Sequence, residues 1–341
     1  MIEIFLNPEL YPSVNLRISR KHGVIYHLPS EIILFISSIL IYLCLMTITF
    51  SKMATAVPDF QTNTAIIADM HIHSTASDGE YSPGDIAAML HKNKIKVAAL
   101  ADHDTFAGFH EFKSAFSGIA VPGVELSVEY NEVGLHLLAY GFDPLHQAFC
   151  ERLEHFQKIR YHRIEMICER LCELGKPLTI DEVKNNYPQE TTLGRPHIAR
   201  AMIAKGYIKS FNQAFQKYIG DDKPAYVAKT RLDFDEALEL IKASGGISIL
   251  AHPGLFLSKI SFDVIKMLPV DGFEAYHPNH TSSLSRILVD HCLKHDLPYS
   301  GGSDFHDLRR NKTNVIGKWG LRENEWQYLK TYINNHCFYQ I

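Results

Sequence analysis

Seven short stretches of this chain place histidine or acidic residues at the ends of apolar segments, most of which are rich in β-branched residues. They lie at residues 69–73, 78–79, 102–104, 123–125, 136, 251–253 and 302–306. Short apolar runs of this kind are typical of buried strands. One histidine after a strand is common, but seven such stretches indicate one acidic pit, lined with imidazoles, that holds several divalent cations.

The segments around these stretches alternate between strand and helix patterns from residue 64 onward. Strands are expected at 64–70, 97–101, 119–125, 135–141, 246–252, 271–277 and 297–304. Helices are expected at 83–92, with Ser82 as the N-cap, and near 105–116, 233–244, 258–268 and 281–295. Seven strands, mostly separated by helices, predict an α/β fold with a parallel barrel or an open sheet. The ligand residues follow the carboxyl ends of the strands, where β/α barrels carry their active sites.

Residues 145–230 interrupt this alternation. A long amphipathic helix is expected at 151–174, ending before Gly175, and shorter helices at about 179–187, 196–205 and 211–218. We therefore predict a helical insertion that caps the site, between barrel segments at 64–144 and 231–320.

The composition is that of an ordinary globular protein. The 341 residues are 46% hydrophobic and 21% charged, with a net charge of -4, which gives no general attraction for polyanions. The six cysteines form no C-x-x-C pair, so they predict no thiolate zinc site and fit a reducing compartment. The 19 histidines are in excess and concentrate in the stretches above.

The amino terminus has three interpretations. Residues 32–50 carry no charge, follow Arg17, Arg20 and Lys21, and are long enough to span a bilayer as a helix. Residues 54–56 (A-T-A) resemble a signal-peptide cleavage site. Alternatively, residues 1–52 come from an upstream start codon and Met53 is the true first residue. We expect a cytoplasmic protein, with an inner-membrane anchor at 32–50 as the alternative.

The side chains in the seven stretches suit catalytic metal binding. His71 and His73 point to the same face of a strand and can chelate one ion together. Imidazoles mixed with carboxylates suit Mn²⁺, Fe²⁺ or Zn²⁺, and the lack of thiolates argues against a structural zinc site. A carboxylate such as Glu125 can bridge two ions about 3.5–4 Å apart.

Between residues 69 and 306 the chain carries, in order, D-M-H-I-H-S-T-A-S-D-G, A-D-H-D-T, G-V-E, G-R-P-H, K-P-A-Y-V, A-H-P and G-G-S-D-F-H. In this combination the motifs resemble the PHP (polymerase and histidinol phosphatase) superfamily of metal-dependent phosphoesterases. G-R-P-H-I-A-R-A-M and K-P-A-Y-V resemble the branch with ribonuclease AM and the nucleoside 3′,5′-bisphosphate phosphatases. The resemblance implies a distorted (β/α)7 barrel with a helical insertion domain.

The resemblance also implies three divalent ions per chain, most simply Mn²⁺, with Fe²⁺ or Zn²⁺ as alternatives. His71, His73, Glu125 and Asp304 would hold the first ion. Glu125, His136 and His252 would hold the second ion. Asp78, His103 and His306 would hold the third ion.

Arg195 and Lys223 match the phosphate-binding residues of the family, because guanidinium and ammonium groups bind phosphate oxygens. Asp221 and Asp222 depart from the family pattern, and carboxylates there would either weaken phosphate affinity or alter the substrate preference. His277 is a candidate proton donor to the leaving group.

Four further residues have open roles. His280 could contact substrate, and His197 could pack or cap a helix. Asp102 and Asp104 either orient a ligand or make ordinary hydrogen bonds at a strand end.

The expected activity is metal-dependent phosphoester hydrolysis of nucleotides. By resemblance, the substrates are nucleoside 3′,5′-bisphosphates or short 5′-phosphorylated RNA and DNA trimmed 5′ to 3′. The alternatives are a phosphatase of another small metabolite of the histidinol phosphate type, a C–N hydrolase with a similar metal barrel, and a non-catalytic metal or nucleotide sensor in the membrane. No stable protein partner is predicted.

Overall fold

A computed structural model describes residues 3–5, 17–19, 65–185, 187, 191–308 and 315–341. The chain divides into two compact units, residues 1–61 and 62–341. In the first unit, the described residues form an antiparallel pair of short strands, β1 (Glu3–Phe5) and β2 (Arg17–Ser19). The predicted apolar segment at 32–50 and the cleavage-site sequence at 54–56 lie outside the described residues. Among the described residues, no helix is both long and apolar enough to cross a membrane.

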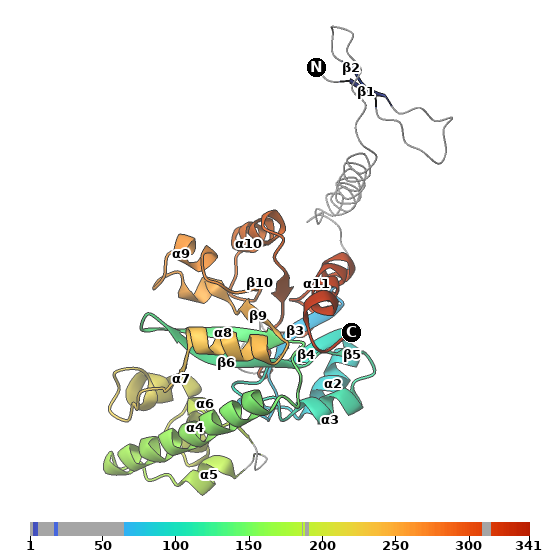
Figure 1. The fold of residues 1–341 in the computed structure, drawn as a ribbon. Helices are drawn as coiled ribbons and strands as arrows, with labels where there is room; N and C mark the ends of the chain where they lie inside the picture. Colours follow the sequence, from blue (N-terminus) through green and yellow to red (C-terminus); the bar gives the residue numbers. More distant parts are fainter. Residues whose placement is uncertain (1–2, 6–16, 20–64, 186, 188–190, 309–314) are drawn as a thin grey trace. The chain divides into compact units, whose positions relative to one another are not determined.

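Seven strands of the second unit form the barrel. They are β3 (Ala68–Ile72), β4 (Val97–Leu100), β6 (Gly123–Tyr130), β7 (Val133–Tyr140), β9 (Ile247–Leu250), β10 (Gly272–Tyr276) and β11 (Tyr299–Gly301). One sheet has the order β11-β10-β9-β7-β6-β8, ending in the short β8 (Leu232–Asp233), and the other has the order β3-β4-β5, ending in the short β5 (Ile119–Ala120). The bridges Ile72–Phe305 and His103–Glu125 join the two sheets. The distorted barrel predicted from the sequence is therefore confirmed (Figure 1).

One strand of the barrel departs from the parallel arrangement. β7 is antiparallel to both of its neighbours, β6 and β9. A tight turn at Asn131 and Glu132, which have positive φ angles of 47° and 65°, joins β6 directly to β7. The strand expected at 119–125 is also two strands, β5 and β6, separated at Val121 and Pro122. The expectation of a parallel sheet was thus wrong for β7.

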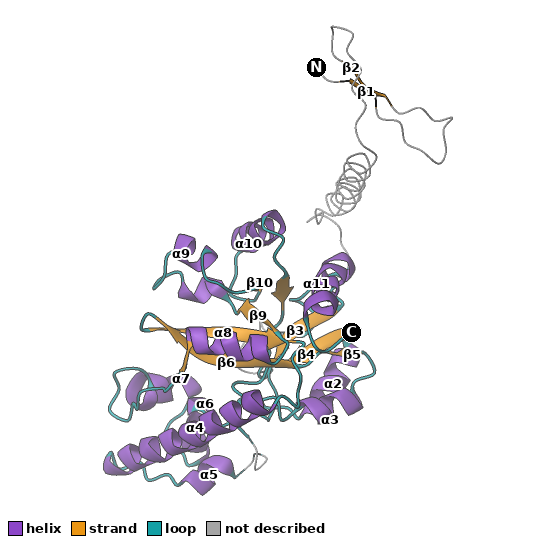
Figure 2. Ribbon diagram, in the orientation of Figure 1, coloured by secondary structure: helices purple, strands orange, loops and turns teal. Residues whose placement is uncertain are grey.

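Helices lie outside the strands (Figure 2). They are α2 (Pro83–Lys92), α3 (Phe109–Ala115), α8 (Phe234–Ala243), α9 (Phe262–Lys266), α10 (Ser282–Lys294) and α11 (Glu323–His336). Helix α2 begins and ends as predicted, because Ser82 accepts a hydrogen bond from the backbone N–H of Asp85 and Pro83 fits the first turn. The sequence patterns did not predict α11, whose Trp326 is 2% exposed in the barrel core.

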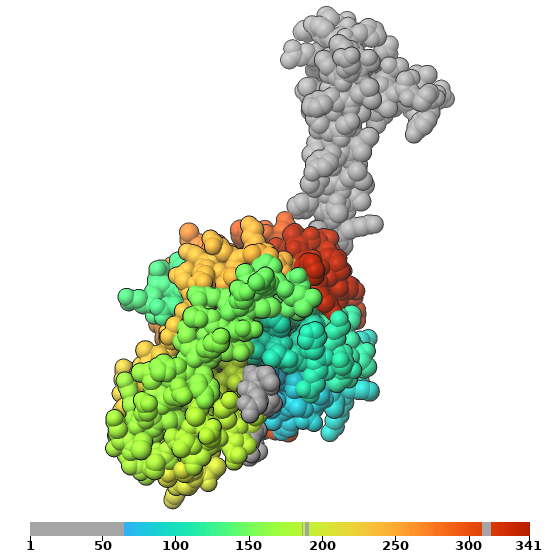
Figure 3. Space-filling view, turned by 60° about the horizontal axis from the view of Figure 1, so that its bottom comes forward, coloured from blue at the N-terminus to red at the C-terminus, as the bar shows by residue number. Residues whose placement is uncertain are grey.

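The helical insertion begins with α4 (Gln147–Glu173), which ends before Gly175 at a φ of +70°. It continues with α5 (Ile180–Lys184), α6 (Arg195–Ala204), α7 (Phe211–Ala214) and a π-helical turn at Phe215–Ile219. The first half of α4 buries Leu153 and Phe156 in the barrel core, and the second half buries residues such as Ile167 in a separate core of the insertion. We call residues 147–219 the cap; Figure 3 shows it in green and yellow beside the cyan barrel segments. The domain boundaries predicted from the sequence stay predictions.

Candidate metal centre

The structure brings all nine predicted metal ligands to one end of the barrel. They lie on β3, β6 and β7 and on the loops after β3, β4, β9 and β11: His71, His73, Asp78, His103, Glu125, His136, His252, Asp304 and His306. His136 reaches this end from the antiparallel strand because its carbonyl accepts a hydrogen bond from Ala251, beside the end of β9. Residues up to 235 positions apart in sequence, His71 and His306, therefore share one site.

Glu125 lies at the centre of this site and is 1% exposed. Its two carboxylate oxygens lie within 3.5 Å of nitrogen atoms of five histidines, His71, His73, His103, His136 and His252. Oε1 is 2.8 Å from His136 and 2.9 Å from His252, and Oε2 is 2.9 Å from His103. Burial raises the pKa of Glu125, but the surrounding histidines hold it well below its usual range. Glu125 is therefore placed to serve more than one ion.

The imidazole of His71 is oriented by a residue that the sequence patterns did not single out. Glu274 of β10 is fully buried, and its Oε1 lies 2.9 Å from Nδ1 of His71. Its Oε2 accepts a hydrogen bond of 2.7 Å from the backbone N–H of His252. A proton on Nδ1 of His71 leaves Nε2 directed toward His73, Glu125 and Asp304, the usual way in which a carboxylate orients a metal-binding histidine.

A second set of ligands gathers around the loop that follows β3, where His306 from the segment after β11 meets Asp78. Nε2 of His306 lies 3.1 Å from Oδ1 of Asp78, and the rings of His73 and His306 stack with centroids 4.0 Å apart. Desolvation lowers the pKa of His73 to about 3 and that of His136 to about 4, so both imidazoles present lone pairs at neutral pH. Neutral imidazole is the form that binds metal ions.

Two observations indicate that the ligand atoms of this site are suited to binding metal ions. First, ligand atoms within 4.8 Å of one another form three groups: His73, Asp78, His103 and His306; His71, His73 and Asp304; and His103, Glu125 and His136. Second, among the described residues, Nδ1 of His73, Nδ1 of His103, Oε2 of Glu125 and Nδ1 of His252 are buried without a well-angled hydrogen bond. Burial of so many unsatisfied polar atoms is costly, and bound cations would remove that cost.

These groups resemble, with differences, the ligand sets expected from the sequence. His73 joins the expected set of Asp78, His103 and His306, and His103 joins Glu125 and His136. Nε2 of His252 also approaches the carboxylate of Glu125. The backbone of His252 itself lies in the left-handed region, with a φ of +31°. The assignment of ligands to individual ions therefore stays a prediction.

Asp69, Asp102 and Asp104 support the ligand-bearing segments instead of facing the ligand atoms. Asp102 accepts hydrogen bonds from Ser74 and Ser77 at 2.5–2.7 Å and so fixes the loop between His73 and Asp78. Asp69 accepts a hydrogen bond from the backbone of Ser303, next to Asp304, and burial raises its pKa to about 7.

The cap holds the same loop from the opposite side. Nη2 of Arg200 in α6 donates a hydrogen bond of 2.9 Å to the backbone carbonyl of Asp78, and the guanidinium lies 3.3 Å from Glu80. Thr191 Oγ1 and the backbone N–H of Thr192 donate hydrogen bonds of 2.8 Å to the carbonyls of Thr75 and Ala76.

His197, whose role was open, is fully buried at the start of α6. Its Nδ1 accepts a hydrogen bond of 3.0 Å from the backbone N–H of Gly194, and its ring packs edge-on against Tyr187. It caps and packs the helix.

Of the predicted phosphate-binding residues, Arg195 lies in the cap and Lys223 follows it. Nη1 of Arg195 lies 2.7 Å from Oδ1 of Asp221, one of the two carboxylates that depart from the family pattern. The guanidinium also lies 5.6 Å from the Phe215 ring centroid and 5.7 Å from that of Tyr226. Lys223 is exposed. The structure does not bring either residue into direct contact with a predicted metal ligand, and their phosphate-binding role stays a prediction.

Two other cations lie closer to the metal ligands and were missed in the sequence. Nη2 of Arg160 in α4 is 2.5 Å from Asp104 and donates a hydrogen bond of 3.0 Å to Ser127. Nζ of Lys229 donates a hydrogen bond of 2.7 Å to the same Ser127 oxygen, two residues after Glu125. Part of Lys229 reaches solvent, but its ammonium group is enclosed, and this desolvation lowers its pKa to about 7. Arg160 and Lys229 thus lie beside Asp104 and near Glu125, and Lys229, with a pKa of about 7, is only partly protonated at neutral pH.

His277 and His280 lie beside the centre on the segment that follows β10. Nε2 of His277 is 3.3 Å from Oδ2 of Asp304, and its Nδ1 accepts a hydrogen bond from the backbone N–H of Asn279. The ring proton of His277 is therefore on Nε2, directed at Asp304. His280 is held by the carbonyl of Ala275 and the N–H of Gly254.

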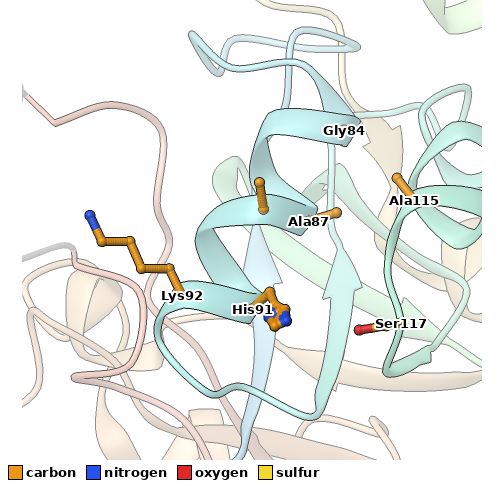
Figure 4. Close-up of a pocket in the computed structure, with 7 residues that line it drawn as sticks. Gly84, Ala87, His91, Lys92, Ala115 and Ser117 are labelled. Atoms are coloured by element: carbon orange, nitrogen blue, oxygen red, sulfur yellow. The ribbon is translucent and has the colours of Figure 1, made fainter.

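A surface cavity of about 430 Å³ lies away from this centre. It is lined by α2 and α3 residues such as Ala87, His91 and Ala115, and it contains none of the predicted site residues (Figure 4). We therefore place the candidate active site at the cluster of imidazoles and carboxylates, where bound cations would occupy the space between the ligand atoms.

No model of a protein family matches the chain. Individual proteins do. The chain is 34% identical over 247 residues to a 5′-3′ exoribonuclease of Haemophilus influenzae, covering 70% of this chain and 89% of that protein. It is 30% identical over 262 residues to the 5′-3′ exoribonuclease Rnm of Escherichia coli, covering 72% and 87%. It is 28% identical over 248 residues to a 3′,5′-nucleoside bisphosphate phosphatase of Chromobacterium violaceum, covering 70% and 86%.

Solved structures also share the fold, and two of them are similar to most of this chain. A protein of Bifidobacterium adolescentis, assigned as a metal-dependent phosphoesterase, matches with a TM-score of 0.71 and 26% identity over 77% of this chain and 95% of its own. An amidohydrolase of Chromobacterium violaceum with bound sulfate and no metal matches with a TM-score of 0.68 and 26% identity over 78% and 96%.

The barrel, its cluster of imidazoles and carboxylates and these relatives show that the chain belongs to the PHP-type metal-dependent phosphoesterases. It is a hydrolase of phosphoester bonds, as the motifs predicted. This family membership argues against the non-catalytic sensor among the alternatives.

Proposed function

We propose that this enzyme holds three divalent ions, most simply Mn²⁺ with Fe²⁺ or Zn²⁺ as alternatives, and hydrolyses nucleotide phosphoesters. Its substrates would be nucleoside 3′,5′-bisphosphates and short 5′-phosphorylated RNA or DNA trimmed 5′ to 3′. The observation that carries the proposal is the set of three overlapping ligand groups, linked by His73 and His103 around the single carboxylate of Glu125. The names of the relatives, 5′-3′ exoribonucleases and a nucleoside bisphosphate phosphatase, support the substrate class.

The nine ligands listed above would hold the ions, with Glu125 shared between at least two of them. When bound, the ions would lower the pKa of a water molecule to near neutrality and neutralise phosphoryl oxygens. Glu274 would keep Nε2 of His71 directed at the ions, and Asp102 would hold the Asp78 loop in place. These contacts preorganise the site before substrate arrives.

The cations around the centre would bind the substrate's phosphate groups. Arg160 and protonated Lys229 would offer positive charge near the ligands, and Arg195 of the cap and Lys223, which follows the cap, would add to it. His277 would hold a proton on Nε2 for Asp304 or for the leaving oxygen.

The test uses the purified full-length protein with Mn²⁺, adenosine 3′,5′-bisphosphate and a 5′-phosphorylated oligoribonucleotide. We expect phosphate release from the bisphosphate and mononucleotides from the oligoribonucleotide. Activity should disappear in EDTA and return with Mn²⁺, and Asp304→Ala should remain inactive in both cases. Faster turnover of histidinol phosphate than of both nucleotide substrates would contradict the proposal, and so would full activity in EDTA. A cytoplasmic location and the absence of a stable protein partner stay proposals.

A further inference from the structure

The cap contains a cavity of about 490 Å³. Gln157, Lys158 and Tyr161 line it from one face of α4. Lys184 of α5, with Thr191 and Leu193, lines it from the segments that lead to α6. The cavity is open to solvent, and its volume is comparable to that of sites that bind small ligands.

Both walls of this cavity touch segments that carry predicted metal ligands. On one wall, Thr191 Oγ1 donates a hydrogen bond of 2.8 Å to the carbonyl of Thr75, within the loop between His73 and Asp78. On the other wall, the residue before Tyr161 is Arg160, which contacts Asp104 next to His103. Tyr161, at one end of the cavity, therefore directly follows a residue that reaches the carboxylate beside the predicted ligand His103.

The side chains at this end suit a nucleotide. The phenol ring of Tyr161 offers a stacking surface, and Nζ of Lys184 lies 5.2 Å from its centroid. Lys158, one turn earlier on α4, provides a second cation for a phosphate. The carboxylate of Glu154 also lines the cavity, but it lies seven residues before Tyr161, roughly 10 Å along the helix. Aromatic rings beside lysines are the usual means by which proteins bind single-stranded nucleic acid without reading its sequence.

We propose that this cavity binds the nucleotide that follows the reacting one in an oligonucleotide, with its base on Tyr161 and its phosphate near Lys158 and Lys184. The inference rests on the proposed function and deepens it, because such a subsite serves an exonuclease substrate and has no use for a lone bisphosphate. With a net charge of -4, the chain as a whole does not attract polyanions, so binding of an oligonucleotide depends on local cations such as Lys158 and Lys184.

The test compares Tyr161→Leu with the wild-type protein on two substrates, with Mn²⁺ present. For a 5′-phosphorylated pentaribonucleotide we expect kcat/KM to fall by about 5- to 150-fold, mainly through KM, the range that loss of one base-stacking contact gives. For adenosine 3′,5′-bisphosphate we expect less than about a twofold change. Tyr161→Phe keeps the stacking surface and should behave like the wild-type protein on both substrates.

A matched control is Tyr207→Leu, because Tyr207 is another cap tyrosine with lysines over its ring, Lys176 at 5.4 Å and Lys205 at 5.5 Å, and it does not line the cavity. It should leave both activities unchanged. The inference would be overturned if Tyr161→Leu lost activity equally on both substrates or lost none on the pentaribonucleotide. It would also be overturned if Tyr207→Leu lost as much activity as Tyr161→Leu. Wild-type protein that cleaves neither substrate would instead refute the proposed function itself.

Discussion

Arg200 provides a sharp test of how the cap supports the metal centre. It belongs to α6, yet its guanidinium donates to the backbone carbonyl of Asp78 at 2.9 Å and approaches Asp307, next to His306, at 3.9 Å. Both neighbours lie on segments that carry ligands of the same predicted group. Arg200→Ala would remove these contacts between the cap and those segments.

The expected loss follows from these contacts. A hydrogen bond from a charged donor contributes about 1.5–3 kcal/mol, whereas the ion pair with the partly exposed Glu80 adds at most about 1 kcal/mol. Residues that orient metal ligands typically change metal affinity by about 10- to 100-fold, or about 1.4–2.8 kcal/mol, which agrees with the hydrogen-bond figure. We therefore expect Arg200→Ala to weaken one class of bound Mn²⁺ by about 10- to 100-fold and the others by less than about twofold.

The assay is a titration of chelator-stripped protein with Mn²⁺, followed by calorimetry and by elemental analysis of the bound metal. Arg152→Ala is the matched control. Arg152 also joins the cap to the barrel, through an ion pair of 2.8 Å between α4 and Glu236 of α8, and within the described part of the chain it contacts no ligand-bearing segment. Unchanged Mn²⁺ affinity in Arg200→Ala, or the same loss in both variants, would refute the reasoning.

Three further predictions concern the centre and its surroundings. Glu125→Gln removes the carboxylate that five histidines approach, so bound Mn²⁺ should fall by at least one ion per chain in elemental analysis; an unchanged content would contradict a shared ligand. The pKa of Lys229 falls from 10.5 in the unfolded chain to about 7 in the folded chain, so between these pH values the unfolded chain binds more protons. The free energy of unfolding should therefore rise with pH over this range, by at most about 1.4 kcal/mol per pH unit. Thermal unfolding of Lys229→Met at several pH values should lose this rise, and an identical pH profile would argue against the lowered pKa. A Cβ at Gly302 would lie 2.4 Å from the backbone nitrogen and Cβ of His71, so Gly302→Ala should lower the free energy of unfolding by about 1–3 kcal/mol in urea titrations, and wild-type stability would show that β3 can shift.

The sequence predicted those features that depend on local chemistry. Helix α2 was predicted at its observed bounds because Ser82 and Pro83 specify a helix start by themselves. The clustering of the predicted ligands could be anticipated because their side chains end apolar strands or follow them in short motifs, and their binding of metal ions stays a prediction. The family followed from the same motifs, and the relatives confirm it.

The remainder depends on contacts between distant segments. The antiparallel direction of β7 follows from a two-residue turn whose residues, Asn131 and Glu132, carry no decisive signal in the sequence. Glu274 lies mid-strand and looks like an ordinary buried position until β10 is placed beside β3. Arg160 and Arg200 look like surface arginines on amphipathic helices, and only the docking of the cap brings them to Asp104 and Asp78.

Closure of the barrel between Ile72 and Phe305 has a consequence for protein synthesis. His71 and His73 leave the ribosome early, whereas Asp304 and His306 are added more than two hundred residues later. A nascent polypeptide cannot bring these groups together before its last strand emerges. If this enzyme degrades RNA, translation of its own message is therefore nearly complete before the growing chain acquires any capacity to cleave.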